Sequence, residues 1–301
     1  MITLLPRLPV PETFIDFLGE HSHCVPGPWL HGSRLRDEVT DAYEALRAAS
    51  PEAQEVTRRL RDLLDDPYGE GCAVLGLAPV LDHYGLGYGQ KAATIVLSWL
   101  GTPLRLRDQQ PLWHTQSVDL LLSPVRTTAP RPLHLDAVSA VRPPDYTAFL
   151  CVRPDPRGGG HVLVSQTRRA VNRLGEDERA LLAETVFHHD EHTAVTGVGG
   201  ALDVFPVLDG LSPLDGFVRF HPDMAADRAP TDLHTSALHA LHRELTVGQR
   251  RFPLTPGDLL IVNQHLSAHG RDALGHGQTT LPEERRRTTW QTYLHTANSP
   301  A

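Results

Sequence analysis

The first hundred residues carry apolar side chains at the three- and four-residue spacing of helices. Ser50 followed by Pro51 is typical of a helix start, and the apolar positions of 54–64 continue the pattern. The segment 89–100 predicts a buried helix that a following glycine ends. The short apolar run 71–77 predicts a strand between these two helices.

From about Leu112, the sequence pattern changes to short runs rich in β-forming residues, which proline and glycine separate. Two helical patterns interrupt these runs, at about 176–187 and 231–247. Many short strands with turn residues between them predict a mainly β fold, closed or in two sheets, with flanking helices packed outside. The expected strands are 117–122, 133–138, 146–152, 161–166, 216–220 and 259–263.

The length of 301 residues is enough for a full core. We expect a single domain over 1–301, with a helix-rich part at 1–105 packed on a β core at 106–296. The content of 40% hydrophobic and 21% charged residues is that of an ordinary soluble globular protein. No run of the sequence is apolar enough for a membrane span, and a net charge of −8 argues against a nucleic-acid partner.

Three cysteines, Cys24, Cys72 and Cys151, are widely spaced and too few for a disulfide framework. They are typical of a protein of the reducing cytoplasm, which is where we expect this one.

Candidate chemistry centres on the stretch 131–138, in which His134 and Asp136 alternate with apolar residues. On a strand, residues i and i+2 project from the same face, so an imidazole and a carboxylate would point into one space. These are two of the three ligands of the 2-His-1-carboxylate triad, which holds non-haem Fe(II) and leaves positions open for small molecules.

Four further pairs share the His-x-acid spacing. His242 and Glu244 lie in a helical pattern, where residues two apart diverge and cannot chelate one ion. The pairs at 188–191 belong to a polar run that predicts a solvated helix end. His221 and Asp223 remain a competing pair.

Two later stretches carry further candidate site residues beside those of 131–138. In 255–271, a Pro-Gly turn launches a buried strand, and a polar segment with His265 and His269 follows it. In 285–295, alternation places Arg287, Thr289, Gln291 and Tyr293 on one strand face.

The ordered set of motifs resembles the Fe(II)/2-oxoglutarate oxygenases of the taurine dioxygenase and clavaminate synthase group. The resemblance spans about 71–294 and implies a double-stranded β-helix core of the jelly-roll, cupin-like kind. It also implies Fe(II), 2-oxoglutarate as co-substrate, and O₂. The matching residues are His134-Leu135-Asp136, Asn263-Gln264, His269-Gly270-Arg271 and Arg287.

By this resemblance, His134, Asp136 and His269 hold the iron, and Arg287 binds the C5 carboxylate of 2-oxoglutarate. Arg285 or Arg286 takes that role if the register slips. Related halogenases have a small residue in place of the metal-binding acid, so Asp136 favours hydroxylation, desaturation or ring closure.

The sequence departs from the family pattern at two places that matter for binding. Val162 stands where a threonine usually helps to hold 2-oxoglutarate. Gln291 stands where amino-acid hydroxylases of the group carry a second arginine for the substrate carboxylate. A neutral amide replaces a bidentate cation poorly, so we expect a carboxylate that is masked or carrier-bound, or one that Arg219 or Arg271 holds.

The predicted function is hydroxylation of a small metabolite, an amino acid or its derivative in specialised metabolism. The expected substrate-binding residues are Gln291, Arg219 and Asp223, the last for a cationic group. The alternatives are a cupin-like metalloenzyme that does not use 2-oxoglutarate, a non-catalytic small-molecule-binding protein on the same scaffold, and a plain zinc site.

Overall fold

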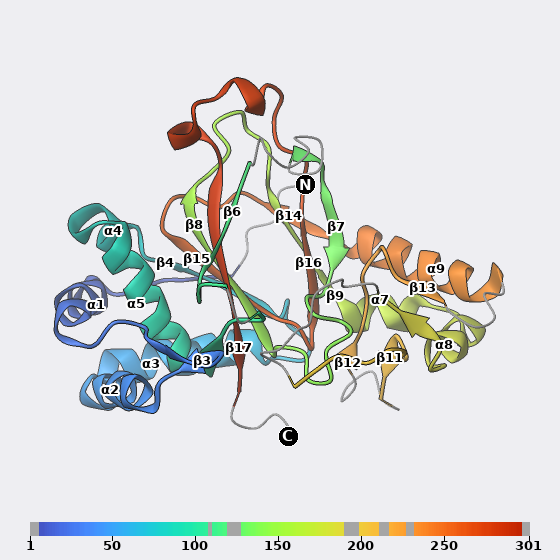
Figure 1. Ribbon diagram of the computed structural model, residues 1–301, viewed down its shortest axis with the longest axis horizontal. Coiled ribbons are helices and arrows are strands. Elements are labelled where there is room, and N and C mark those ends of the chain that lie inside the picture. Colours follow the sequence, from blue (N-terminus) through green and yellow to red (C-terminus); the bar gives the residue numbers. More distant parts are fainter. Residues whose placement is uncertain are drawn as a thin grey trace.

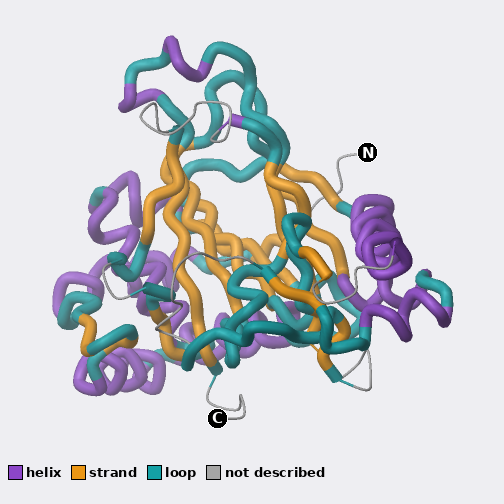
Figure 2. Tube along the Cα trace, turned by 45° about the vertical axis from the view of Figure 1, so that its right-hand side comes forward, coloured by secondary structure: helices purple, strands orange, loops and turns teal. Residues whose placement is uncertain are grey.

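The computed structural model describes residues 6–107, 110–118, 128–189, 199–210, 217–226 and 232–296. Strands gather in the centre of the molecule, and helices cover it on two sides (Figure 2). The helices are α1 (Glu12–Cys24), α2 (Asp37–Ala49), α3 (Pro51–Leu64), α4 (Ala78–Tyr84), α5 (Leu86–Ser98), α7 (Thr167–Arg173), α8 (Glu176–Leu182) and α9 (Asp232–Gly248). Short 3₁₀ turns are Gln278–Thr280 and Glu283–Arg285.

A nine-stranded sheet forms the larger layer. Its strand order is β1-β4-β15-β8-β17-β5-β3-β2, and β6 also pairs with β17. The strands are β1 (Arg7–Leu8), β4 (Cys72–Gly76), β15 (Asp258–Asn263), β8 (Tyr146–Arg153), β17 (Thr288–His295), β5 (Thr102–Leu104), β3 (Arg34–Leu35), β2 (Leu30–His31) and β6 (His114–Ser117).

A four-stranded antiparallel sheet, in the order β14-β9-β16-β7, forms the smaller layer. Its strands are β14 (Arg250–Phe252), β9 (Val162–Gln166), β16 (Ser267–Arg271) and β7 (Arg131–His134). Two short antiparallel pairings, β10 (Phe187–His188) with β13 (Ala225–Ala226) and β11 (Leu208–Asp209) with β12 (Phe217–Val218), lie outside both sheets.

The period-2 alternation of the strands explains the layers. In β8, Ala148 and Leu150 pack against helices α1–α5, whereas Phe149 and Cys151 face inward. The inward residues meet Val162 and Val164 of β9 and others in one buried cluster, so the two sheets face each other. Helices α7–α9 pack on the outer face of the smaller sheet, opposite α1–α5 (Figure 1).

Several sequence predictions agree with these elements. Ser50 caps α3, and its hydroxyl accepts the backbone N–H of Ala53 at 3.1 Å. The sheet-rich fold with flanking helices is confirmed. The division of the chain at about residue 105 stays a prediction.

Other boundaries differ from those expected. The helix at 176 ends at Leu182, and Phe187 instead lies fully buried in strand β10. A strand begins at His114 rather than at 117, and residues 119–122 lie outside the described part of the chain. Helix α7 was not expected, because five of its seven residues are polar.

Close backbone packing explains the glycine of the His-Gly-Arg motif. A Cβ at Gly270 would lie 2.7 Å from the carbonyl oxygen of Arg131 on the neighbouring strand. Glycine therefore allows β7 to pair with β16, across an irregularity in register between His269 and Arg271.

No helix in the described ranges combines the length and the apolar character that crossing a bilayer requires.

Candidate metal centre and co-substrate pocket

A pocket between the two sheets collects polar side chains from both. His134, Asp136 and His269 line it on the side of the smaller sheet, and Gln291 and Arg287 line it on the other side. The predicted metal ligands and the predicted co-substrate anchor therefore share one space.

His134 and His269 are direct cross-strand neighbours on β7 and β16. Their ring centroids lie 4.6 Å apart, and both rings face the pocket. Residues directly opposite on antiparallel strands have close Cβ atoms, so this pairing brings together imidazoles that are 135 positions apart in sequence.

Asp136 reaches the same point by a different route from the one the alternation predicted. Strand β7 ends at His134, and Asp136 lies in the turn that follows. The backbone N–H of Leu135 donates to the carbonyl oxygen of Phe220 at 2.9 Å. The backbone N–H of Asp136 donates to Oε1 of Gln264 at 2.7 Å. These two hydrogen bonds, rather than strand pairing, fix the position of the carboxylate.

The three ligand atoms fit a divalent metal ion. Nε2 of His269 lies 3.2 Å from one oxygen of Asp136, and Nε2 of His134 lies 3.7 Å from the other. The whole set falls within 4.8 Å. Metal–ligand bonds of about 2.1 Å place ligand atoms at right angles roughly 3 Å apart, close to these separations.

The protonation states also suit a metal. Nδ1 of His134 lies 2.8 Å from the carbonyl oxygen of Pro132, to which it donates, so the lone pair of Nε2 points to the centre. Burial and the nearby His269 lower the pKa of His134 to about 4, and this ring is neutral near pH 7. Burial opposes ionisation of Asp136, but the adjacent imidazoles outweigh it and hold the carboxyl pKa below its usual range.

The other end of the pocket is basic. Arg131, Arg271 and Arg287 line it, and Asp136 is its one acidic lining residue in the described chain. Burial lowers the pKa of Arg287, and burial with the nearby charges of Arg287 and Arg131 lowers that of Arg271 to about 9. This concentration of positive charge suits an anionic ligand.

The three arginines differ in their protein contacts. Arg271 donates to the carbonyl oxygens of Asp272 and Ala129. No hydrogen bond or ion pair to Arg287 occurs within the described ranges. Of the neighbouring arginines, Arg285 is exposed and Arg286 donates to the carbonyl oxygen of Leu281.

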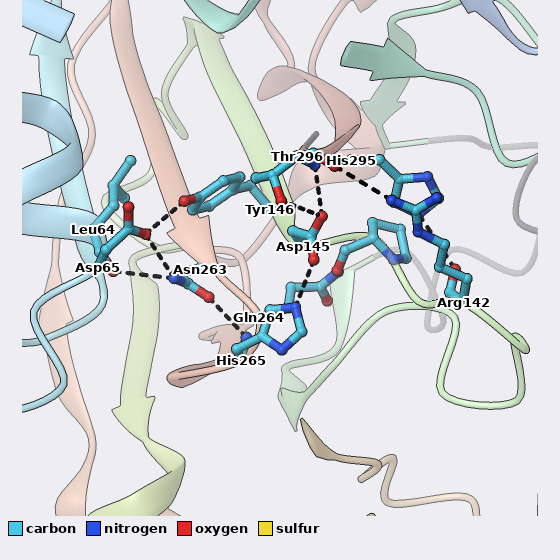
Figure 3. A network of polar contacts seen from close by, with 11 residues as sticks. Leu64, Asp65, Arg142, Asp145, Tyr146, Asn263, Gln264, His265, His295 and Thr296 are labelled. Atoms are coloured by element: carbon cyan, nitrogen blue, oxygen red, sulfur yellow. Dashed lines mark hydrogen bonds and ion pairs between the residues drawn. The ribbon is translucent and has the colours of Figure 1, made fainter. Parts of the chain in front are cut away.

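His265 lies outside the metal centre. Its Nε2 is 2.7 Å from the buried carboxylate of Asp145, and Figure 3 shows the ring turned toward that residue. The backbone N–H of Thr296 donates to the other oxygen of Asp145 at 2.6 Å. This network fastens the β15–β16 turn, which carries Gln264, to the end of β17.

The competing pair His221 and Asp223 is placed beside the centre. The ring of His221 lies 5.3 Å from that of His134, but the side chain of Asp223 is 83% exposed and does not line the pocket. His188 and His189 are partly buried, so the predicted solvated helix end is wrong for them, and 190–191 lie outside the described residues. The ring of His189 instead packs 4.3 Å from that of His221.

Arg219 does not line the pocket and is held by partners within the protein. Its guanidinium donates to the carbonyl oxygens of Val138 and Ala140 at 2.8 and 2.7 Å, and it pairs with Asp209 at 2.8 Å. The side chain is only 5% exposed. These contacts hold the chain beyond Asp136 rather than a ligand.

Sequence reasoning missed several pocket residues. Gln116 and Phe149 come from β6 and β8, and Leu254 follows β14. Arg131 opens the central stretch but was not singled out. The pocket residues that the sequence did indicate are those of the metal motifs and the alternating set Arg287, Thr289 and Gln291.

Two facing sheets that enclose two histidines, one carboxylate and a basic end are typical of mononuclear non-haem metal oxygenases. Residues 101–293 match the family model described as "Taurine catabolism dioxygenase TauD, TfdA family". The match covers more than half of the chain, so the protein belongs to the TauD/TfdA family of dioxygenases. The family expected from the motifs is confirmed.

Solved structures support the same fold. Asparagine oxygenase in complex with Fe(II), hydroxyasparagine and succinate is similar with a TM-score of 0.73 and 19% identity, over 97% of this chain and 93% of that one. The non-haem iron oxygenase OrfP in complex with Fe and alpha-ketoglutaric acid is similar with a TM-score of 0.72 and 17% identity, over 97% and 94%. A search of curated protein sequences returned no significant match.

The metal-free protein is expected to lose stability on acidification. Burial lowers the pKa of His134 to about 4 and that of His221 to about 3, whereas an unfolded histidine titrates near 6.5. Between these values the unfolded chain binds more protons, so the free energy of unfolding falls as the pH drops from 6.5 to 4, by up to about 1.4 kcal/mol per pH unit for each proton.

Denaturant unfolding of the metal-free protein at pH 7 and pH 5 measures this effect. The His221→Gln variant should show a smaller decrease than the wild type. Equal decreases would contradict the expected burial of a neutral His221.

Proposed function

We propose that the protein is an Fe(II)- and 2-oxoglutarate-dependent oxygenase that hydroxylates an amino acid or an amino-acid derivative. The observation that carries the proposal is one pocket that holds the His134, Asp136 and His269 set at one end and Arg287 at the other. Membership of the TauD/TfdA dioxygenase family supports it. The two facing sheets support the finer assignment of a double-stranded β-helix.

His134, Asp136 and His269 would hold the iron. Bound Fe(II), with 2-oxoglutarate and O₂, supplies the oxidising power that breaks a substrate C–H bond. The chain itself provides two imidazoles, one carboxylate and a cavity between two apolar sheet faces. No acid or base from the protein is required for such a reaction.

Arg287 would bind the C5 carboxylate of 2-oxoglutarate. Its side chain is partly buried and has no hydrogen-bond or ion-pair partner in the described chain, so a bidentate carboxylate would compensate its charge. Thr289 follows on the same strand face and lines the same pocket. We assign to it the hydroxyl contact that Val162 cannot make.

Two observations bear on the substrate. Asparagine oxygenase carries hydroxyasparagine in its structure, and OrfP carries L-Arg in one of its own. In this chain, Arg219 and Arg271 donate to backbone carbonyl oxygens, and Gln291 is neutral. We therefore favour an amino-acid derivative whose carboxylate is masked, as an amide, an ester or a carrier-bound thioester.

The first prediction concerns the metal ligands. Alanine at His134, Asp136 or His269 should each abolish stoichiometric Fe(II) binding, because three ligands are the fewest that form this centre. Anaerobic Fe(II) titration of the metal-free protein measures the binding. Alanine at His265 or Asp223 serves as the control and should leave it intact; loss of iron in these controls alone would overturn the assignment.

The second prediction concerns the co-substrate. Arg287→Ala should raise the KM for 2-oxoglutarate at least about tenfold, because a charge-assisted contact of about 1.5–3 kcal/mol is lost. Arg285→Ala is the matched control and should leave the KM unchanged. Equal effects of the two substitutions would remove Arg287 from this role.

The third prediction concerns the substrate. Succinate release from 2-oxoglutarate, with product masses, should be greater for amino-acid amides, esters and thioesters than for the corresponding free amino acids. Faster turnover of free amino acids than of every masked form would exclude the masked-carboxylate proposal and leave the oxygenase proposal intact.

A further inference from the structure

Gln291 is surrounded by four hydrogen-bonding partners. Its Nε2 donates to Oδ2 of Asp136 and to Oγ1 of Thr147, at 3.0 Å each. Its Oε1 accepts from Nε2 of His114 at 3.0 Å and from Nε2 of Gln116. Only 2% of the residue is exposed.

These partners use the full capacity of the amide and fix its orientation. A glutamine amide has two donor hydrogens and an oxygen with two lone pairs, and all four are engaged. A flipped amide would place its oxygen against the carboxylate of Asp136 and its N–H groups against two donors. Because an ionised carboxylate only accepts, Asp136 favours the orientation in which the Gln291 amide nitrogen faces it.

We propose that Gln291 is a positioning residue that sets the rotation of the Asp136 carboxylate, while His114 and Gln116 hold the Gln291 amide in place. The proposal builds on the proposed iron site and extends it to residues that do not touch the metal. Gln264 fixes the backbone of Asp136, so the two glutamines together determine where its carboxylate lies.

The neutral charge of Gln291 matters for this role. An arginine at the same position would form an ion pair with Asp136 and reduce the negative charge that the carboxylate offers to a metal. An amide orients the carboxylate and leaves its charge intact. Gln291 thereby serves Asp136 rather than the substrate, and all its hydrogen-bonding groups are already occupied.

The test is the Fe(II) affinity of the metal-free protein, measured by anaerobic titration. Gln291→Glu replaces the amide donor by a second carboxylate. Gln291→Met removes the amide donor but keeps a side chain of similar length. Both should weaken Fe(II) binding by about 10–100-fold, the usual effect of losing a partner of a metal ligand. Thr292→Val is the matched control, because this neighbour is buried on the helix side of β17 and its hydroxyl has no partner in the described chain.

A second variant keeps the test valid if the substitutions at Gln291 prevent folding. His114→Phe retains the stacking on Tyr293 but removes a donor to Oε1 of Gln291, without touching Asp136. It should weaken Fe(II) binding in the same direction by a smaller factor. The Co(II)-substituted protein should also show an altered visible spectrum in the Gln291 and His114 variants and an unaltered one in Thr292→Val.

The outcomes separate the two proposals. Wild-type protein that fails to bind Fe(II) would overturn the proposed function. The positioning role alone would be overturned if the wild type binds Fe(II) and the folded variants bind it with the same affinity and show the same Co(II) spectrum. The variants compared are Gln291→Glu, Gln291→Met and His114→Phe. A fall in melting temperature without a change in affinity would assign Gln291 to fold stability alone.

Discussion

The register between β7 and β16 is the constraint on which the site depends. It sets His134 opposite His269, and the turn after β7 then brings Asp136 to the same point. A shift of one residue in this register would direct His134 to the helix-covered face, since side chains alternate along a strand. The flanking strands β9 and β14, the apolar cluster between the sheets and the helices α7–α9 all stabilise this pairing.

The sequence indicated the parts of the site that depend on local pattern. The order of motifs singled out His134, Asp136, His269 and Arg287, which line one pocket, and alternation placed Arg287, Thr289 and Gln291 on one face. The capped start of α3 followed from Ser50 and Pro51. Each motif is short, so the spacing of residues within it can be read from the sequence.

Features that depend on distant partners were not predictable. The end of β7 before Asp136 depends on Gln264, which is 128 positions away. Phe187 leaves the helical pattern because it pairs with β13 and packs beside Phe205. Arg219 was expected at the substrate, but three oxygens brought together by the fold hold it elsewhere. A single sequence carries no signal for such contacts.

At Gly270, the addition of a single methyl group would disrupt the pairing of β7 with β16. A methyl group there would meet the carbonyl oxygen of Arg131 at 2.7 Å and push the two strands apart. The spacing of the His134 and His269 imidazoles thus depends on the absence of a side chain at Gly270, a residue that takes no part in the chemistry. In a survey of random substitutions, Gly270 would tolerate replacement as poorly as a metal ligand does. The cause would be steric exclusion by the neighbouring backbone and not a loss of chemistry.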